Sequence, residues 1–220
     1  MQAQAMLLDL MEPEGATGRM VLGSHSVIMS GFARDQAQTL FEEMNTIAAV
    51  SPFRKMVTRS GGQMSIACTN CGDVGWVSDR SGYRYDRIDP TTGQSWPKMP
   101  PLFAEISGKA AETAGYGKFE PDACLINRYE PGSRLSLHQD RNERDFDHPV
   151  VSVSLGLPAI FQWGGPKRED RPTRARLAHG DVMVWGGPDR LMFHGVRELA
   201  DGFHPLVGPV RYSLTFRKAL

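Results

Sequence analysis

The sequence has no excess charge of either sign, few cysteines and no long apolar run. Its 25 basic and 25 acidic side chains cancel, so no long-range field favours a nucleic-acid coat protein, and any nucleic-acid contact must be local. Three cysteines, Cys68, Cys71 and Cys124, cannot all pair and do not resemble a secreted disulfide framework. The N-terminal apolar stretch lacks a basic leader and is broken by Asp9, and no window approaches a membrane span. We therefore expect a cytoplasmic protein with no membrane partner.

Two segments have the periodicity of amphipathic helices. The first begins near Asp35, which is expected as its N-cap, and ends at the SPF tripeptide. The second is expected from Pro101 to Ala114, because proline suits the first turn of a helix. The apolar stripe of the first helix comprises Ala37, Leu40, Phe41, Met44 and Ile47, and that of the second comprises Leu102, Phe103, Ile106 and Ala110.

Beyond Pro121 the sequence alternates between short apolar segments and Gly or Pro turns. This pattern predicts an antiparallel sandwich or barrel, with a jelly roll as the preferred version, in a mainly β protein with flanking helices (α+β). One compact domain is expected, made of an N-terminal extension and helix (1–50), a lid of short strands and loops (51–98), and a helix with the jelly-roll core (99–220). The strand segments are ACLINRY, RLSLHQD, PVVSVSLG, AIFQWGG, RARLAHG, DVMVWGG, LMFHGV and VRYSLTFR.

A metal site is predicted from His138, Asp140 and His194. Residues two apart on an extended chain project to the same side, so His138 and Asp140 can hold one ion while Gln139 points away. Two imidazoles and one carboxylate form the ligand set of non-haem Fe(II) oxygenases. An HxD triplet alone is most often a solvated loop. His179 illustrates that simpler case, because it is expected in a turn.

The final strand indicates which ligand occupies the open coordination positions of the ion. Its alternation places Val210, Tyr212, Leu214 and Phe216 on one face, and Arg211, Ser213, Thr215 and Arg217 on the other. Guanidinium groups match carboxylates, so the two arginines indicate a small dicarboxylate gripped from both sides. The combination predicts a dioxygenase that uses Fe(II), O2 and 2-oxoglutarate.

Several motifs together resemble the AlkB-type alkylated-DNA-repair dioxygenases over about residues 50–217. They are NRYEPGSRLSLHQD, PVVSVSLGLPAIFQWGG, HGDVMVWGG and RYSLTFR, with PFRKMVT, TNCGDVGWVSD and GYRYDRIDP upstream. The resemblance implies a double-stranded β-helix with an N-terminal nucleotide-recognition lid. It also implies oxidative dealkylation of N-alkylated bases in DNA, preferably single-stranded, by a monomer that releases formaldehyde, succinate and CO2. Because the target is a Watson–Crick edge, the base must be extruded or already unpaired.

The resemblance also assigns roles to individual residues. His138, Asp140 and His194 would bind iron, and Asn127, Tyr129, Arg211, Ser213 and Arg217 would line the 2-oxoglutarate site, with Arg211 on the distal carboxylate and Arg217 counted as catalytic. For the substrate, Trp76 would stack on the base opposite His138, Tyr83 and Tyr85 would contact the nucleotide backbone, Thr58 and Met64 would shape the pocket, and Arg168 would lie near the flipped base.

Two positions depart from the family's pattern. Asn142 stands where HxDxD has a second carboxylate, so we expect weaker selection for cationic 1-methyladenine and 3-methylcytosine. Ser213 replaces the asparagine of RxNxTxR, and its shorter side chain should weaken cosubstrate binding. The CTNC motif is not taken as a zinc site, because a closed site needs two more ligands and Cys124 lies far along the chain.

Two other functions remain open at this stage. The chain could be a 2-oxoglutarate oxygenase acting on RNA, a protein or a small molecule, since the iron core does not encode the substrate. It could also be a non-catalytic jelly-roll binding module whose triad holds zinc or nothing.

Overall fold

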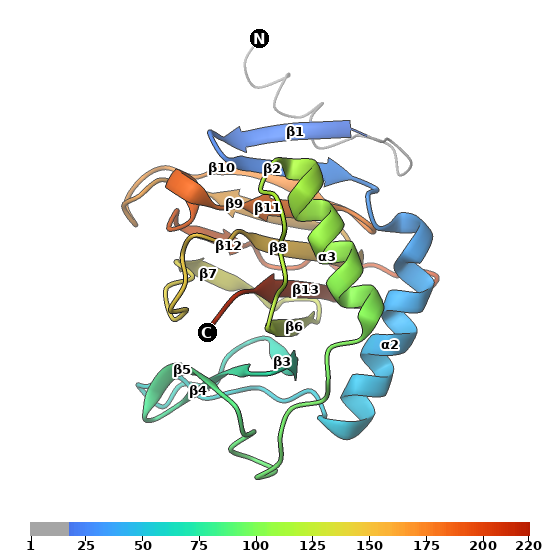
Figure 1. Ribbon diagram of the computed structural model, residues 1–220, viewed down its shortest axis with the longest axis vertical. Helices are drawn as coiled ribbons and strands as arrows, with labels where there is room; N and C mark the ends of the chain where they lie inside the picture. Colours follow the sequence, from blue (N-terminus) through green and yellow to red (C-terminus); the bar gives the residue numbers. More distant parts are fainter. Residues whose placement is uncertain (1–17) are drawn as a thin grey trace.

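Two antiparallel β-sheets face each other and form the jelly roll (Figure 1). The computed structural model describes residues 18–220, so residues 1–17 of the expected N-terminal extension lie outside the described residues. The larger sheet has the order β1-β2-β11-β8-β13-β6-β3, and its strands are β1 (Gly18–Gly23), β2 (Ser26–Ser30), β11 (Val182–Trp185), β8 (Val150–Gly156), β13 (Arg211–Arg217), β6 (Ala123–Tyr129) and β3 (Ala67–Gly72). The smaller sheet consists of β10 (Thr173–Leu177), β9 (Ala159–Trp163), β12 (His194–Val196) and β7 (Leu135–His138).

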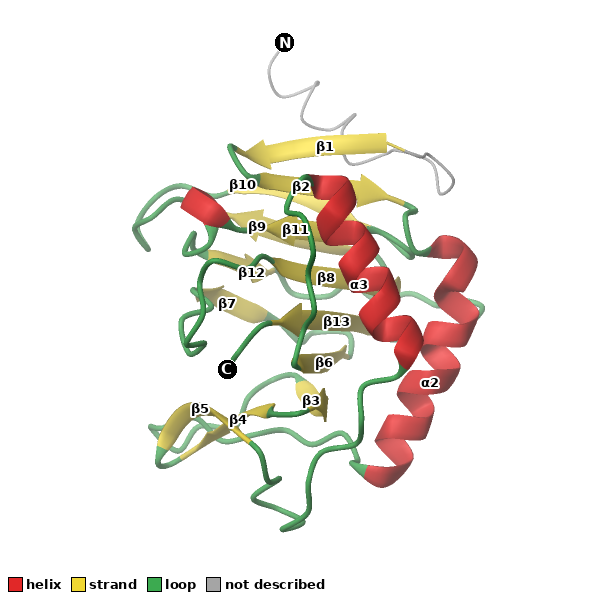
Figure 2. Ribbon diagram, in the orientation of Figure 1, coloured by secondary structure: helices red, strands yellow, loops and turns green. Residues whose placement is uncertain are grey.

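Two helices cover the outer face of the larger sheet (Figure 2). Helix α3 (Pro101–Ala114) has the predicted bounds, and it ends where Gly115 adopts a φ of 98°, a conformation that glycine reaches without strain. Phe103 of α3 packs edge-on against Phe216 of β13, with the ring centroids 5.8 Å apart. None of the helices within residues 18–220 has the length and apolarity needed to cross a membrane.

The start of α2 (Ala37–Val50) differs from the prediction. Asp35 was expected as the N-cap, but it lies in the short 3-10 turn η1 (Arg34–Gln36), and Gln36 occupies the N-cap position without a side-chain hydrogen bond. The apolar stripe was placed correctly, because Leu40, Met44 and Ile47 are buried. The helix is therefore fixed by packing rather than by a capping side chain.

All eight predicted strand segments form strands, and β13 alternates as expected. Tyr212, Leu214 and Phe216 pack toward the helices, whereas Arg211, Ser213 and Arg217 face the cavity between the sheets. Segment 52–98 divides into two parts. Strand β3 pairs with β6 at the edge of the larger sheet, while β4 (Gly75–Asp79) and β5 (Gly82–Asp86) form a separate hairpin, which we call the lid hairpin.

The three cysteines are buried and free. Cys71 lies directly opposite Cys124 in the β3–β6 ladder, so the expectation that Cys124 is remote from the CTNC motif is wrong. Sequence separation gave no sign of this pairing because β3 reaches β6 only through the assembled sheet. Burial raises the pKa of the Cys68 thiol to about 12, although the nearby charge of Arg54 acts in the opposite direction. The raised pKa disfavours the thiolate that zinc requires.

Candidate metal and cosubstrate site

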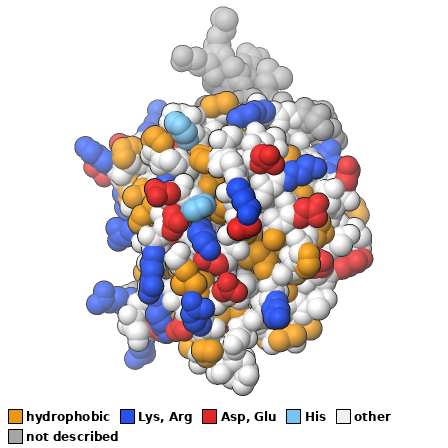
Figure 3. Space-filling view, viewed as in Figure 1, with side chains coloured by type: hydrophobic (Ala, Val, Ile, Leu, Met, Phe, Trp, Pro, Cys, Tyr) orange, Lys and Arg blue, Asp and Glu red, His pale blue; other side chains and the backbone are white. Residues whose placement is uncertain are grey.

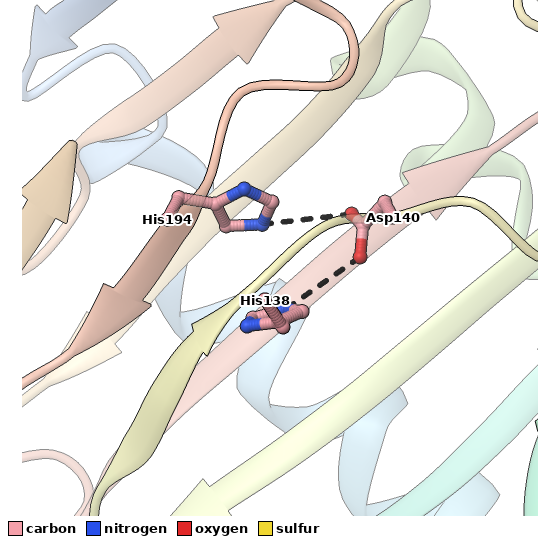
Figure 4. Close-up of side chains that lie close together, drawn as sticks. All are labelled: His138, Asp140 and His194. Carbon is pink, nitrogen blue, oxygen red and sulfur yellow. Dashed lines mark ion pairs between the residues drawn. The ribbon is translucent and has the colours of Figure 1, made fainter. Parts of the chain in front are cut away.

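His138, Asp140 and His194 converge at the inner face of the smaller sheet (Figure 4). His138 ends β7, and His194 begins β12 directly opposite it in the antiparallel ladder. One ligand atom from each of the three side chains lies within 4.8 Å of the other two. The Asp140 carboxylate is 3.6 Å from Nε2 of His138 and 3.8 Å from Nε2 of His194. Within residues 18–220 this is the one cluster of three or more His, Cys, Asp or Glu side chains that could hold a metal ion.

Backbone carbonyls orient both imidazoles. Nδ1 of His138 lies 2.9 Å from the Ser136 carbonyl oxygen, and Nδ1 of His194 lies 2.9 Å from that of Met192. A carbonyl oxygen can only accept, so each Nδ1 carries the proton and each Nε2 presents its lone pair to the Asp140 side. Burial lowers the pKa of His194 to about 4, which keeps this imidazole neutral and able to bind a metal.

Asp140 is a buried carboxylate held in its charged form. Burial alone would raise its pKa, but the positive charge of Arg217 leads the effects that outweigh burial and hold the pKa well below its usual range. Arg217 donates to Oδ2 from Nη2 at 2.7 Å and from Nε at 3.1 Å. Oδ1 is therefore the oxygen left for a metal. Gln139 stays out of the ligand set and donates to the Leu191 carbonyl oxygen at 2.6 Å.

A cavity of about 730 Å³ opens beside the triad. Arg211 lies in its wall and is only 1% exposed. Its Nη2 donates to Ser154 Oγ at 3.0 Å, while its Nε and Nη1 have no hydrogen-bond partner among the described residues. Buried donors of this kind are rare unless a ligand completes them. A carboxylate fits here, because it would accept the hydrogens and neutralise the charge.

The other residues expected around the cosubstrate lie in the same wall. Asn127 and Tyr129 belong to β6, and the Tyr129 ring lies 5.0 Å from the Arg211 guanidinium carbon. Ser213 lines the cavity and its hydroxyl lies 3.0 Å from that of Ser152. Arg217 lines the cavity as well, but its Nε and Nη2 already contact Asp140 and Glu143, so the two arginines have different partners.

The residues expected to bind substrate all line the cavity, namely Thr58, Met64, Trp76, Tyr83, Tyr85, Asn142 and Arg168. Trp76 stacks on Tyr83 with ring centroids 5.7 Å apart, and its Nε1 donates to Asn142 Oδ1 at 3.3 Å. Tyr83 is 47% exposed, as a contact with a nucleotide backbone requires. Tyr85 differs, because its hydroxyl turns inward and donates to Glu143 at 2.8 Å. Burial raises the pKa of Tyr85 well above its usual range, so it stays protonated as a donor.

Positive side chains gather around the cavity. Arg134, Arg141 and Arg168 line it, and the Arg168 guanidinium carbon lies 4.9 Å from the Phe193 ring centroid. Figure 3 shows Lys and Arg side chains along the left edge of the molecule, the side on which Figure 1 places β7 and the lid hairpin. Arg54 is engaged elsewhere, since it pairs with Asp89 at 2.6 Å.

Sequence reasoning missed two residues that support the metal ligands. Glu143 is 6% exposed, accepts from Tyr85 and lies 3.2 Å from Nε of Arg217. Arg190 is 3% exposed and donates to the Asp140 backbone carbonyl at 2.8 Å. In the sequence, Glu143 is one acid in the charged run DRNERD and Arg190 follows a turn, so no local signal distinguishes them. His179 lies in a turn as predicted, with Nδ1 accepting from the Gly156 N–H at 3.0 Å.

Comparisons with known proteins agree with this geometry. The model of the 2OG-Fe(II) oxygenase superfamily matches residues 25–217. The chain is 55% identical over 198 residues to "Alpha-ketoglutarate-dependent dioxygenase AlkB" of Escherichia coli, covering 90% of this chain and 92% of that one. It is 32% identical to "DNA N(6)-methyladenine demethylase ALKBH1C" of Arabidopsis thaliana over 67% of this chain and 38% of that protein. The solved structure of OsALKBH1 superimposes with a TM-score of 0.81 at 26% identity, covering 91% of this chain and all of that chain.

Proposed function

The chain belongs to the 2OG-Fe(II) oxygenase superfamily, and from that membership we propose that it oxidatively removes N-alkyl groups from DNA bases, preferentially in single strands. It is an Fe(II)- and 2-oxoglutarate-dependent dioxygenase. The single observation that carries the substrate proposal is the cavity, because one wall holds the His-Asp-His triad and the orphaned Arg211 donors, and another is the aromatic lid hairpin.

The protein's residues position reactants rather than perform acid–base chemistry. When bound, Fe(II) with 2-oxoglutarate and O2 supplies the oxidising power that hydroxylates the N-alkyl carbon, with succinate and CO2 as coproducts and formaldehyde released from an N-methyl base. His138, Asp140 and His194 would hold the metal, and Arg211 would hold the cosubstrate's distal carboxylate. The aromatic side chains of Phe161 and Trp185 lie 5.9 and 5.0 Å from the His194 ring, measured between centroids, and exclude water from that side.

Features of the lid side support a nucleic-acid base as substrate. Trp76 and Tyr83 offer adjoining aromatic faces, and every base has a flat face that can stack on such a ring. Arg134, Arg141 and Arg168 at the same cavity offer positive charge for neighbouring phosphates, although the chain as a whole is neutral. A cavity of about 730 Å³ admits one base and 2-oxoglutarate, but not a paired duplex segment. An unpaired strand avoids the free-energy cost of extruding the base, which supports the single-strand preference.

The proposal is tested with single-stranded and double-stranded oligonucleotides of equal sequence that carry one 3-methylcytosine. Each is incubated with Fe(II), ascorbate and 2-oxoglutarate, and the mass of the oligonucleotide is followed. We expect the oligonucleotide mass to fall by one CH2 group, because demethylation replaces N–CH3 by N–H. This loss should depend on 2-oxoglutarate and be faster on the single strand. An RNA oligonucleotide and a methylated peptide are run in parallel. If succinate forms and the RNA or the peptide is demethylated while neither DNA oligonucleotide is, the demethylated molecule becomes the assigned substrate in place of DNA.

A further inference from the structure

The lid hairpin is joined to the metal site by two side-chain hydrogen bonds that end on one short loop. Trp76 of β4 donates to Asn142, and Tyr85 of β5 donates to Glu143. Both acceptors follow the metal ligand Asp140 within three residues. The hairpin forms its own two-stranded sheet. Asn70 of β3 exchanges two hydrogen bonds with the Trp76 backbone, which ties β4 to the larger sheet, whereas the contacts of Trp76 and Tyr85 tie the hairpin to the loop of the metal site.

A continuous series of polar contacts runs from Tyr85 to the metal ligand. The Tyr85 hydroxyl lies 2.8 Å from Glu143 Oε1, and the same oxygen lies 3.2 Å from Arg217 Nε. That Nε lies 3.1 Å from Oδ2 of Asp140. The single hydrogen on Nε therefore faces two carboxylates, and the position of Glu143 influences how firmly Arg217 holds Asp140.

Glu143 also balances the charge of the cluster. Arg217, 6% exposed, contacts the carboxylates of both Asp140 and Glu143, whereas Arg190, 3% exposed, contacts the Glu143 carboxylate and the backbone carbonyl of Asp140. Glu143 is therefore the carboxylate that both buried cations share. Without Glu143, Arg190 would lose this carboxylate partner and Arg217 would depend on Asp140 alone, so the metal ligand would be neutralised more completely.

We propose that Glu143 is a positioning residue that, through its hydrogen bond from Tyr85, couples docking of the lid hairpin to the order of the metal ligand Asp140. A metal fixes Asp140, fixing Asp140 places Glu143, and Glu143 in place holds Tyr85 and the hairpin. By thermodynamic linkage, the docked hairpin raises metal affinity by the same factor. The inference rests on the proposed function only in treating the hairpin as the base-binding lid, and the tests below contain no nucleic acid.

The first test follows hydrogen exchange in the lid. Mn(II) with 2-oxoglutarate is added to the full chain, and the exchange rates of Gly82–Asp86 amides are compared with and without the metal. We expect about tenfold slowing in the wild type, the factor that matches roughly 1.4 kcal/mol for a hydrogen bond to a charged acceptor. Tyr85→Phe should abolish the slowing. Tyr116→Phe is the matched control, because its hydroxyl bonds to the His25 carbonyl outside the cavity, and it should behave like the wild type.

The second test is a double-mutant cycle on Mn(II) affinity, measured by calorimetry. Tyr85→Phe should weaken Mn(II) binding by up to about tenfold, and Glu143→Gln by about tenfold or more, in the range found for residues that support metal ligands. The double variant should be no weaker than Glu143→Gln alone, because both changes break one series of contacts.

The proposal would be overturned if the losses of Mn(II) affinity caused by Tyr85→Phe and Glu143→Gln were additive in the double variant. It would also be overturned if the variants bound Mn(II) as tightly as the wild type. Lid exchange that is indifferent to Mn(II) in the wild type would overturn it as well. If Glu143→Gln does not fold, the exchange experiment on Tyr85→Phe decides the question alone, since that change removes one hydroxyl from a half-buried ring. A failure to demethylate DNA would leave both readouts intact, so the two proposals fail separately.

Discussion

Replacing Arg211 by methionine should change ligand binding and protein stability in opposite directions. Two donor nitrogens of this buried guanidinium have no hydrogen-bond partner among residues 18–220, and burial lowers its pKa. Two charge-assisted hydrogen bonds to a 2-oxoglutarate carboxylate are worth about 1.5 kcal/mol each at the lower end. Their loss of about 3 kcal/mol corresponds to a roughly hundredfold rise in Kd. Removing a buried, incompletely paired charge should leave the Tm of the free protein unchanged or higher.

The assay titrates 2-oxoglutarate into the Mn(II)-loaded protein by calorimetry and records Tm for both forms. Arg211→Lys serves as the graded control, because it keeps the charge but loses the paired donors of the guanidinium, and its Kd should fall between those of the wild type and Arg211→Met. An Arg211→Met protein that binds within about threefold of the wild type would refute the assignment of Arg211 to the cosubstrate. A marked fall in the Tm of the free variant would refute the stability argument.

Three further predictions address lesion preference, acid stability and the core. Asn142→Asp should raise the rate ratio of cationic 3-methylcytosine to neutral 3-methylthymine by about tenfold, since an added carboxylate near a cation is worth about 1–2 kcal/mol; an unchanged ratio in competition assays would count against a role for Asn142. The metal-free protein should lose about 3 kcal/mol of unfolding free energy between pH 6.5 and 4, because the unfolded state protonates His194 in that range and the folded state does not; urea titrations of the wild type and His194→Gln should differ in this pH slope, and equal slopes would exclude His194 as the source. Phe103→Ala should lower the unfolding free energy by about 3–5 kcal/mol in the same assay, since this fully buried ring packs on Phe216, and a loss below about 1 kcal/mol would contradict that packing.

The sequence could predict features whose signal is local. Strand β13 alternates apolar and polar residues, so its two faces follow from the two-residue period of an extended chain. Helix α3 has a proline at its start and Gly115 after its end, and both bounds were correct. His138 and Asp140 share one side of the chain for the same reason. The contribution of His194 needed the family's motif order, because nothing local pairs β12 with β7.

The sequence could not predict contacts that exist only after the sheets and loops assemble. Glu143 gains its importance from residues 47 and 74 positions away, Arg190 and Arg217. Tyr85 belongs to an aromatic lid segment, so a surface role was expected, and only the folded hairpin turns its hydroxyl inward. The capping error at Asp35 has a different physical origin. The chain enters α2 through a 3-10 turn whose backbone N–H groups at Arg34 and Gln36 bond to the carbonyls of Gly31 and Ala33, so Asp35 lies inside this turn and not at the N-cap.

Arg211 and Arg217 show most clearly how assembly separates residues that look equivalent. They lie on one face of one strand, and the alternation of residues alone predicts only that both point into the same space and grip one molecule. The loop after β7 places Asp140 and Glu143 beside Arg217 and engages its Nε and Nη2, whereas Arg211 donates from Nη2 to the Ser154 hydroxyl and lies against the Tyr129 ring. A cation already neutralised can orient a metal ligand, and one left with free donors can bind an incoming anion. The different roles of the two arginines thus follow from the positions of the Asp140 and Glu143 carboxylates. Removing the Glu143 carboxylate should therefore affect metal binding more than cosubstrate binding. Glu143→Gln should leave the Kd for 2-oxoglutarate far less affected than Arg211→Met does, while the order is reversed for Mn(II) affinity, and the same order for both ligands would refute the division.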